Sequence, residues 1–178
     1  MMENLELRMY GMTIYQLSGI QGGIQFGHAK DEYESLAYIV GGTTLDTYQR
    51  WRDKWKTYII LNGGTTNDSK ESPGTIQLYM KLLSSLGVKL AAFREPDLND
   101  SVTALAFLVD ERIFNRMKYP DPSWMKNLRI DMLSSVDVDF SNYPMPDPEP
   151  GDEELIMAIG GPKNVLLRYL LYGMRLAS

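Results

Sequence analysis

The sequence predicts an α/β protein: a four-stranded mixed sheet with helices packed on it, followed by a C-terminal helical extension. Apolar runs of strand length alternate with segments of helical periodicity up to Lys118, in the order strand, helix, strand, helix, strand, strand. After Lys118 the pattern changes to prolines and acidic residues that lead into a last helical segment. We therefore expect an α/β domain over residues 1–118, and an acidic, proline-rich connector with a C-terminal helix over residues 119–178.

The first two elements follow from residue type and spacing. Residues 5–17 mix Tyr, Ile and Thr with polar residues, which is typical of a strand, and Gly11 predicts a break or bulge in it. After a short turn, residues 22–37 form a helix whose apolar stripe begins at Phe26, so one face of this helix is expected to be buried. A short second helix is expected over residues 45–54.

Short apolar runs and helix-boundary residues predict the remaining elements. Residues 56–61 form a nearly continuous apolar run, which is typical of a buried strand. Ser72 and Pro73 predict the start of a helix that ends at Gly87, because serine caps helices, proline suits the first helical position and glycine suits the end. The other expected elements are strands over 88–93 and 102–109, polar loops over 62–71 and 94–101, and a helix from 162 to about 176.

Composition limits the chemistry that this chain can use. None of its 178 residues is cysteine and only His28 is histidine, which excludes disulfides, cysteine nucleophiles and zinc sites with several histidines. The formal net charge of −5 argues against a general nucleic-acid binder, because contacts to phosphates need surplus lysine and arginine. No apolar run approaches ~18 residues and no signal-peptide pattern is present, so we expect a cytoplasmic protein with no membrane contact. No cofactor or metal is expected.

Polar side chains recur at helical spacing on the predicted first helix. Gln21, Gln25 and His28, followed by Glu32, fall within a sector of about 60° if each residue advances by roughly 100°. Amides both donate and accept hydrogen bonds, and a neutral imidazole can act as a general base. This row predicts a ligand-binding or catalytic surface. The alternative is a solvent-facing polar stripe whose histidine bonds to a neighbouring strand.

Four glycines surround the start of the same helix: Gly19, Gly22, Gly23 and Gly27. Such small residues can bring backbone N–H groups close to a phosphate at a helix N-terminus. The spacings of the common nucleotide-binding loops are not met, however. The alternative is that the glycines allow the helix to pack closely on the sheet.

The predicted loop over residues 94–101 is rich in charged side chains. It holds Arg94, Glu95, Asp97 and Asn99, and Thr103 opens the strand that follows. Two turn residues would be enough to connect the strands, so the longer loop predicts side chains kept for a function. The alternative is an ordinary charged hairpin loop.

Residues 50–56 contain four basic side chains together with Trp51 and Trp55. Such a cluster could stack a base and hold a phosphate. The alternative is a solvated helix face with two core tryptophans.

Two segments carry a family resemblance: G-I-Q-G-G-I-Q-F-G-H-A at residues 19–29 and F-R-E-P-D-L-N-D-S-V-T-A-L-A at residues 93–106. They resemble the type II peptidyl-tRNA hydrolases, especially divergent members from bacteria and phages, and the resemblance covers about residues 5–109. It implies the fold of that family and a homodimer. It also implies that Gln25 and His28 belong to the family's Q-x-x-H-A pattern and that Glu95 stands where the family has its catalytic aspartate. On this basis the catalytic residues are expected to be His28, Glu95 and Gln25.

One departure from the family bears on the substrate. Gln21 stands where the family has a lysine that works with the aspartate to cleave the ester between peptide and tRNA, and a glutamine cannot supply that charge. Together with the acidic balance, this favours a small nucleotide over tRNA. In this hypothesis Glu95 or His28 acts as base on water or on a ribose hydroxyl. The residues expected to bind the ligand are Gln21, Gly22, Gly23, Arg94, Asp97, Asn99 and Thr103.

Three functions therefore stay open. The favoured one is a phage-encoded protein in the host cytoplasm that cleaves or sequesters a nucleotide signal of host antiviral defence. The second is a genuine peptidyl-tRNA hydrolase in which Lys30 or Lys54 replaces the missing lysine. The third is a non-enzymatic interaction protein that uses the acidic tail and the final helix to bind a partner.

Overall fold

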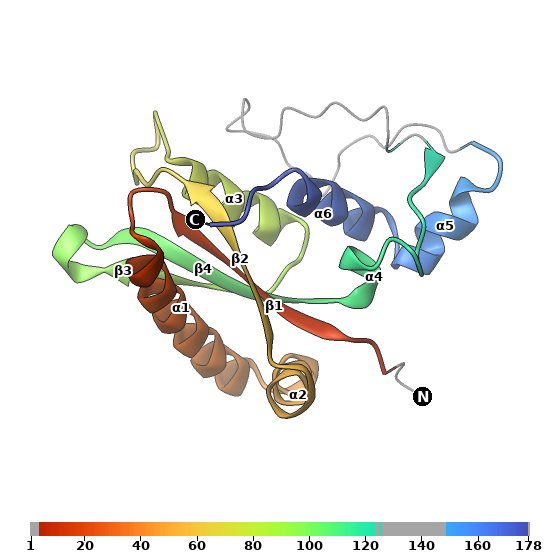
Figure 1. The fold of residues 1–178 in the computed structure, drawn as a ribbon, viewed down its shortest axis with the longest axis horizontal. Coiled ribbons are helices and arrows are strands. Elements are labelled where there is room, and N and C mark those ends of the chain that lie inside the picture. Colours follow the sequence, from red (N-terminus) through yellow and green to blue (C-terminus); the bar gives the residue numbers. More distant parts are fainter. Residues whose placement is uncertain (1–3, 124, 126–148, 178) are drawn as a thin grey trace.

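The computed structural model describes residues 4–123, 125 and 149–177. Its centre is a four-stranded sheet in the order β2-β1-β4-β3 (Figure 1). Strands β1 and β2 are parallel, whereas β4 runs antiparallel to both β1 and β3. The predicted four-stranded mixed sheet with helices is thus confirmed. The strands are β1 (Leu7–Ile14), β2 (Thr57–Gly64), β3 (Leu90–Glu95) and β4 (Ser101–Asp110).

Helices cover both faces of the sheet. Figure 1 shows α1 (Gly19–Val40) and α2 (Gly42–Arg50) on one side, and α3 (Thr75–Ser85) and α6 (Pro162–Tyr172) on the other. The core is correspondingly split into two clusters of buried side chains. Phe26 and Tyr33 of α1 join Ala104 and Ala106 of β4 in one cluster, while side chains of α3 and α6 join alternate residues of the strands in the other. Successive side chains of each strand point to opposite faces, so each strand contributes buried residues to both clusters.

The prediction of a break at Gly11 was wrong, because β1 runs without interruption through this residue. Gly11 pairs with Ile60 on one side and with Ala106 on the other. A Cβ atom at Gly11 would overlap the ring of Phe26, which lies over the strand. The glycine is thus required by the close approach of α1, while the only register shift in β1 lies between Thr13 and Ile14.

Several boundaries differ from those predicted. Helix α1 starts three residues earlier, at Gly19, because Ser18 accepts a hydrogen bond from the Gln21 backbone and forms a capping box with it. Helix α3 starts after Gly74 rather than at Pro73, and Gly87 follows it with the expected positive φ of 81°. The second helix is longer than predicted, because α2 continues into a π-helical turn, Trp51–Trp55.

The C-terminal region packs on the sheet. Its helices are α4 (Glu111–Phe114), α5 (Asp152–Ile159) and α6. Residues 152–159 are therefore helical, whereas the sequence predicted an extended connector there; Pro144, Pro146 and Pro148 lie outside the described residues. Helix α6 ends at Tyr172 rather than near 176. The following residues instead pair with the edge of β2: Asn62 N donates to Arg175 O at 2.9 Å, and Ala177 N donates to Ile60 O at 3.0 Å.

Candidate functional site

The predicted site residues come from segments that meet at one end of the sheet. Strands β1, β2 and β3 all finish there, β4 begins there, and the first turns of α1 start beside them. In α/β sheets ligands commonly bind outside the carboxyl ends of the strands. A ligand site is therefore expected at this end of the sheet.

Gln25 links three elements at this end. The Thr103 hydroxyl donates to Gln25 Oε1 at 2.5 Å, and the Gln25 amide nitrogen donates to a carboxylate oxygen of Glu95. Thr103 is fully buried, while Gln25 and Glu95 are half-buried. The two hydrogen bonds fix the orientation of the Gln25 amide. Glu95 is held through its Oε2 atom, and its other carboxylate oxygen, Oε1, takes no part in these bonds. The sequence predicted all three residues for the site, and the structure brings them into contact.

A β-bulge puts Thr103 in this position. Phe93 pairs with Ala104 and Arg94 pairs with Val102, so Thr103 is the extra residue of β4. Val102 belongs to the core cluster under α3, whereas Ala104 belongs to the cluster under α1. Two residues separated by one would normally face the same side of a strand. The bulge reverses this alternation and turns the Thr103 hydroxyl toward α1.

His28 lies one helical turn beyond Gln25 and is exposed. Its ring stacks on Phe93 of β3, with ring centroids 4.6 Å apart and an interplanar angle of 28°. Phe93 and Glu95 are two residues apart on β3, so His28 and Glu95 lie along the same side of this strand. No hydrogen bond joins them among the described residues. The imidazole is therefore positioned by stacking and open to solvent beside the carboxylate.

Gln21 has a local structural role. Its side-chain oxygen accepts from the backbone N–H of Ser18 at 3.1 Å and from the Ser18 hydroxyl at 3.0 Å, which completes the capping box of α1. The pattern Ser-x-x-Gln is a known N-terminal helix signal, so the sequence carried this information. A ligand contact through the Gln21 carbonyl oxygen would have to replace these two bonds.

Gly22 and Gly23 line a pocket of about 300 Å³ beside the first turn of α1. Strands β1 and β2 supply its floor through Thr13, Ile60 and Asn62, and Ala177 of the C-terminal segment also contributes. Gln25, His28 and Glu95 do not line this pocket. Gln25 is one helical turn beyond Gly22, so the pocket and the Thr103–Gln25–Glu95 chain are neighbours along α1.

Arg94 faces away from this chain of hydrogen bonds. It pairs with Asp68 at 2.9 Å and donates to the backbone oxygen of Asp100 at 2.7 Å. Asp68 also accepts from Gln77 of α3 at 3.1 Å, so Arg94 lies on the α3 side while Glu95 lies on the α1 side. The predicted phosphate contact of Arg94 therefore does not converge with Gln25. Asp97 and Asn99 are exposed in the turn that follows β3.

The ion pair changes the acid–base behaviour of Asp68. The Arg94 guanidinium holds the pKa of the Asp68 carboxyl below its usual range, with help from Gln77. Because the folded-state pKa is lowered, the pair stabilises the protein above the unfolded-state pKa of about 3.9, and this contribution is lost as the pH falls through the folded-state value. We expect Arg94→Gln to raise the pKa of Asp68 toward that of an ordinary aspartate, measured by NMR titration of the carboxyl carbon.

Arg52→Gln serves as the control for this titration, because Arg52 pairs with Asp53 on a different element. It is expected to leave the pKa of Asp68 unchanged. An unchanged pKa in Arg94→Gln as well would show that the guanidinium is not the cause of the shift.

The two lysines considered as replacements for the family's lysine lie elsewhere. Lys30 pairs with Asp31 at 2.7 Å and with Glu34 at 3.1 Å. Lys54 lies 3.8 Å over the ring of Trp55, next to the start of β2 and thus at the opposite end of the sheet from Glu95. Neither amine supplies a positive charge beside Glu95.

The basic–aromatic cluster over residues 50–56 is largely structural. Trp51 is only 1% exposed and donates its indole N–H to the backbone oxygen of Thr57 at 3.2 Å. The Trp55 ring is partly buried and covered by Lys54. A base could not stack on Trp51 without opening the core under α1.

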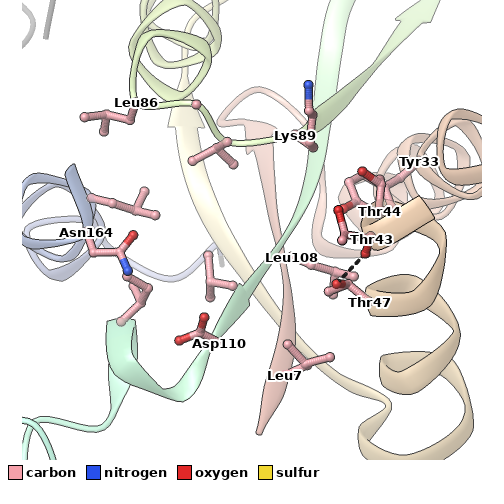
Figure 2. A pocket seen from close by; sticks show the side chains of 15 residues that line it. Leu7, Tyr33, Thr43, Thr44, Thr47, Leu86, Lys89, Leu108, Asp110 and Asn164 are labelled. Carbon is pink, nitrogen blue, oxygen red and sulfur yellow. Dashed lines mark hydrogen bonds between the residues drawn. The ribbon is translucent and has the colours of Figure 1, made fainter. Parts of the chain in front are cut away.

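A second hollow, also of about 300 Å³, lies at the other end of the sheet between α2 and α6 (Figure 2). Two of its polar groups already have partners: the Thr47 hydroxyl donates to Thr43 O at 2.7 Å, and Asp110 accepts two hydrogen bonds from the Arg112 guanidinium. Burial raises the pKa of Tyr33 to about 12, so its phenol stays protonated at neutral pH. None of the predicted site residues lines this hollow.

Fold and site together define an α/β protein with a four-stranded mixed sheet and a Thr–Gln–Glu hydrogen-bond chain at the end where its parallel strands finish. Neither protein-family models nor curated proteins match the sequence. Within the described residues, no helix combines the length and apolar character needed to cross a bilayer, and no three acidic or histidine side chains are grouped to hold a metal.

Proposed function

We propose that this protein is a peptidyl-tRNA hydrolase-like enzyme that acts on a small nucleotide at the end of the sheet where α1 begins. The observation that supports this most directly is the hydrogen-bond chain from Thr103 through Gln25 to Glu95. It orients a half-buried carboxylate next to a pocket that is lined by the glycines of the first helical turn. A positioned carboxylate and a cavity of this size are typical of sites for small ligands.

The proposed reaction uses Glu95 as the general base. Its Oε1 atom would accept a proton from water or from a ribose hydroxyl, while Gln25 holds the other oxygen in place. The deprotonated oxygen then bonds to phosphorus, the P–O bond to the leaving ribose oxygen breaks, and the leaving oxygen takes up a proton. The exposed imidazole of His28, fixed by Phe93, is the second group that can transfer a proton. The Gly22 N–H donates to Ser18 O within the helix, so the free N–H groups of the first turn of α1, beside Gly22 and Gly23, would donate to a phosphate.

A small nucleotide fits this site better than tRNA does. A tRNA acceptor stem carries many phosphates and normally meets a surface with surplus positive charge. Here the net charge is −5, Gln21 replaces the lysine expected from the resemblance, and Lys30 and Lys54 do not reach the site. Glycine N–H groups and neutral side chains are enough for one or two phosphates.

The resemblance to phage members of the family extends the proposal to a biological role. We propose that the ligand is a nucleotide signal of host antiviral defence, which the protein cleaves or sequesters in the host cytoplasm as a homodimer. The chemistry at Glu95 favours cleavage.

The Glu95→Gln variant tests the proposed reaction. Glutamine has the same shape but cannot accept the proton, so turnover of a cyclic dinucleotide or a 3′,5′-cyclic mononucleotide is expected to fall by about 100-fold or more. Product formation is followed by chromatography, and thermal unfolding is expected within a few degrees of the original. Glu153→Gln is the control, because Glu153 is exposed on α5, which packs beside α4 at the opposite end of β4 from Glu95, and it should leave turnover unchanged.

The other outcomes separate the alternatives. Nucleotide binding without product formation would show that the protein sequesters the nucleotide and does not cleave it. Release of amino acid from diacetyl-lysyl-tRNA that depends on Glu95 would identify a genuine peptidyl-tRNA hydrolase. Absence of nucleotide binding, cleavage and ester hydrolysis would contradict the proposal and favour the non-enzymatic interaction protein.

A further inference from the structure

The pocket beside the first turn of α1 has an unusual polar lining. Among the residues that the structure describes, no acidic, basic or histidine side chain lines it, and its walls come from β1, β2, the start of α1 and the C-terminal segment. Its polar side chains include Thr13, Ser18 and Asn62. The Ser18 hydroxyl is already engaged, because it accepts from the Gln21 backbone and donates to the Gln21 side chain. The groups left to a ligand are therefore those of Thr13, Asn62, the exposed Tyr15 and the backbone.

Thr13 points a buried hydroxyl into this pocket. The residue is 2% exposed, and its Oγ1 is the atom nearest to Gly22, 3.4 Å from where a Cβ atom would lie on that glycine. Among the described residues, the Thr13 hydroxyl has no hydrogen-bond partner. The hydroxyl is therefore available to an acceptor atom of a ligand in the pocket.

The Asn62 side chain also offers hydrogen-bond donors in this pocket. Its Oδ1 atom accepts from the backbone N–H of Gly64 at 2.8 Å, which leaves the two N–H groups of the amide on the opposite side of the side chain. Gly19 also lines the pocket, and its N–H group belongs to the first helical turn, where no acceptor exists within the helix. The positive end of the helix dipole lies at the same place. The available groups are thus mainly donors.

We propose that this pocket binds a phosphate group, held by the Thr13 hydroxyl, the Asn62 amide and the backbone N–H group of Gly19. Phosphate oxygens are acceptors and match a pocket of donors without carboxylates. The inference rests on the proposed function in one respect: the phosphate belongs to the nucleotide whose reacting bond is presented to Glu95. Gly22 lies on α1 between the pocket and Gln25. Because it has no side chain, it leaves the Thr13 hydroxyl uncovered.

Titration with inorganic phosphate tests this site independently of any nucleotide. The amide signal of Gly19 is followed by NMR at constant ionic strength, with acetate as a comparison anion. Phosphate is expected to shift this signal at lower concentration than acetate. Thr13→Val, which keeps the shape and removes the hydroxyl, is expected to weaken phosphate binding about tenfold, as for the loss of one charge-assisted hydrogen bond.

Gly22→Ala provides a second variant that does not alter Thr13. Its methyl group would lie against the Thr13 hydroxyl at 3.4 Å, so phosphate binding is expected to weaken although alanine favours the helix. Gly27→Ala is the matched control, because it makes the same change in the same helix, where a Cβ atom meets nothing within 4 Å. It is expected to leave phosphate binding unchanged and to raise thermal stability slightly.

The outcomes distinguish this inference from the proposed function. Phosphate binding that depends on Thr13 and Gly22, without any nucleotide turnover, would support the pocket and contradict the enzyme. Turnover that depends on Glu95 but is unaffected by Thr13→Val would support the enzyme and contradict the phosphate site. Equal affinity for acetate and phosphate, or unchanged phosphate affinity in both Thr13→Val and Gly22→Ala, would overturn the phosphate site.

Discussion

Replacing Asp121 with alanine is expected to lower the free energy of unfolding by about 3 to 5 kcal/mol, because it leaves a buried arginine without its acidic partner. Arg168 of α6 is 1% exposed, and its guanidinium donates to Asp121 at 2.8 Å and to the Tyr119 backbone oxygen at 2.6 Å. It also donates to the backbone oxygen of Arg112, so it ties α6 to two segments that follow β4. Burial lowers the pKa of Arg168 to about 10, and the charge of Arg116 acts in the same direction, but the guanidinium stays charged at neutral pH.

The surroundings of Arg168 explain why the expected loss is large. Its Nε–H is buried and has no hydrogen-bond partner, so the group has no spare interactions that could replace Asp121. Asp121→Asn keeps an acceptor oxygen and removes only the charge, so a smaller loss is expected. Arg168→Met combined with Asp121→Ala removes both charges and is expected to recover part of the stability. Unfolding in urea gives these free energies, and a loss below about 1 kcal/mol in Asp121→Ala would show that the backbone carbonyls alone sustain the charge.

The second large effect is expected where α1 crosses β1. Phe26 is 5% exposed and contacts Tyr58 edge to face, with ring centroids 5.5 Å apart. Phe26→Ala is expected to cost about 3 to 5 kcal/mol through lost burial and the cavity left behind. Gly11→Ala is expected to cost about 1 to 3 kcal/mol, because its methyl group overlaps the Phe26 ring and forces the helix or the ring to move.

The double variant identifies the cause of both losses. Once Phe26 is alanine, the methyl group at position 11 enters the space left by the ring, so the two losses are expected not to add. The double variant should be no less stable than Phe26→Ala alone, with a coupling energy of about 1 kcal/mol or more. Strict additivity, measured by urea unfolding, would show that Gly11 is required for some reason other than the ring.

The main elements were predictable because their signals are local. The apolar stripe that starts at Phe26 placed α1, and the continuous run over 56–61 placed β2. The sequence also carried the capping box of Ser18 and Gln21, which explains the earlier start of α1 and gives Gln21 a role in the helix. The extension of β3 to Glu95 could not be read in the same way, because Arg94 and Glu95 follow the apolar run and look like loop residues.

The end of β3 at Glu95 decided which predicted residues lie in the same site. In a loop, Arg94 and Glu95 could converge on one ligand, but as neighbours in a strand they face opposite sides of the sheet. Gly11 is a similar case, because the ring that requires it belongs to a residue fifteen positions later in the chain. Thr103 reaches Gln25 only because a bulge arises where β4 pairs with β3.

By itself the sequence determined the order of strands and helices up to β4 and the exclusion of cysteine and multi-histidine chemistry. These follow from periodicity, capping and composition, which act over a few residues. The choice of Gln25 and Glu95 as catalytic candidates rested on the family resemblance. Only the tertiary structure decided that Thr103 orients Gln25, that Arg94 lies across the sheet, and that an unpartnered Thr13 hydroxyl faces a pocket beside α1. Register, bulges and cavities depend on strands and helices that are far apart in the chain, so no local pattern specifies them.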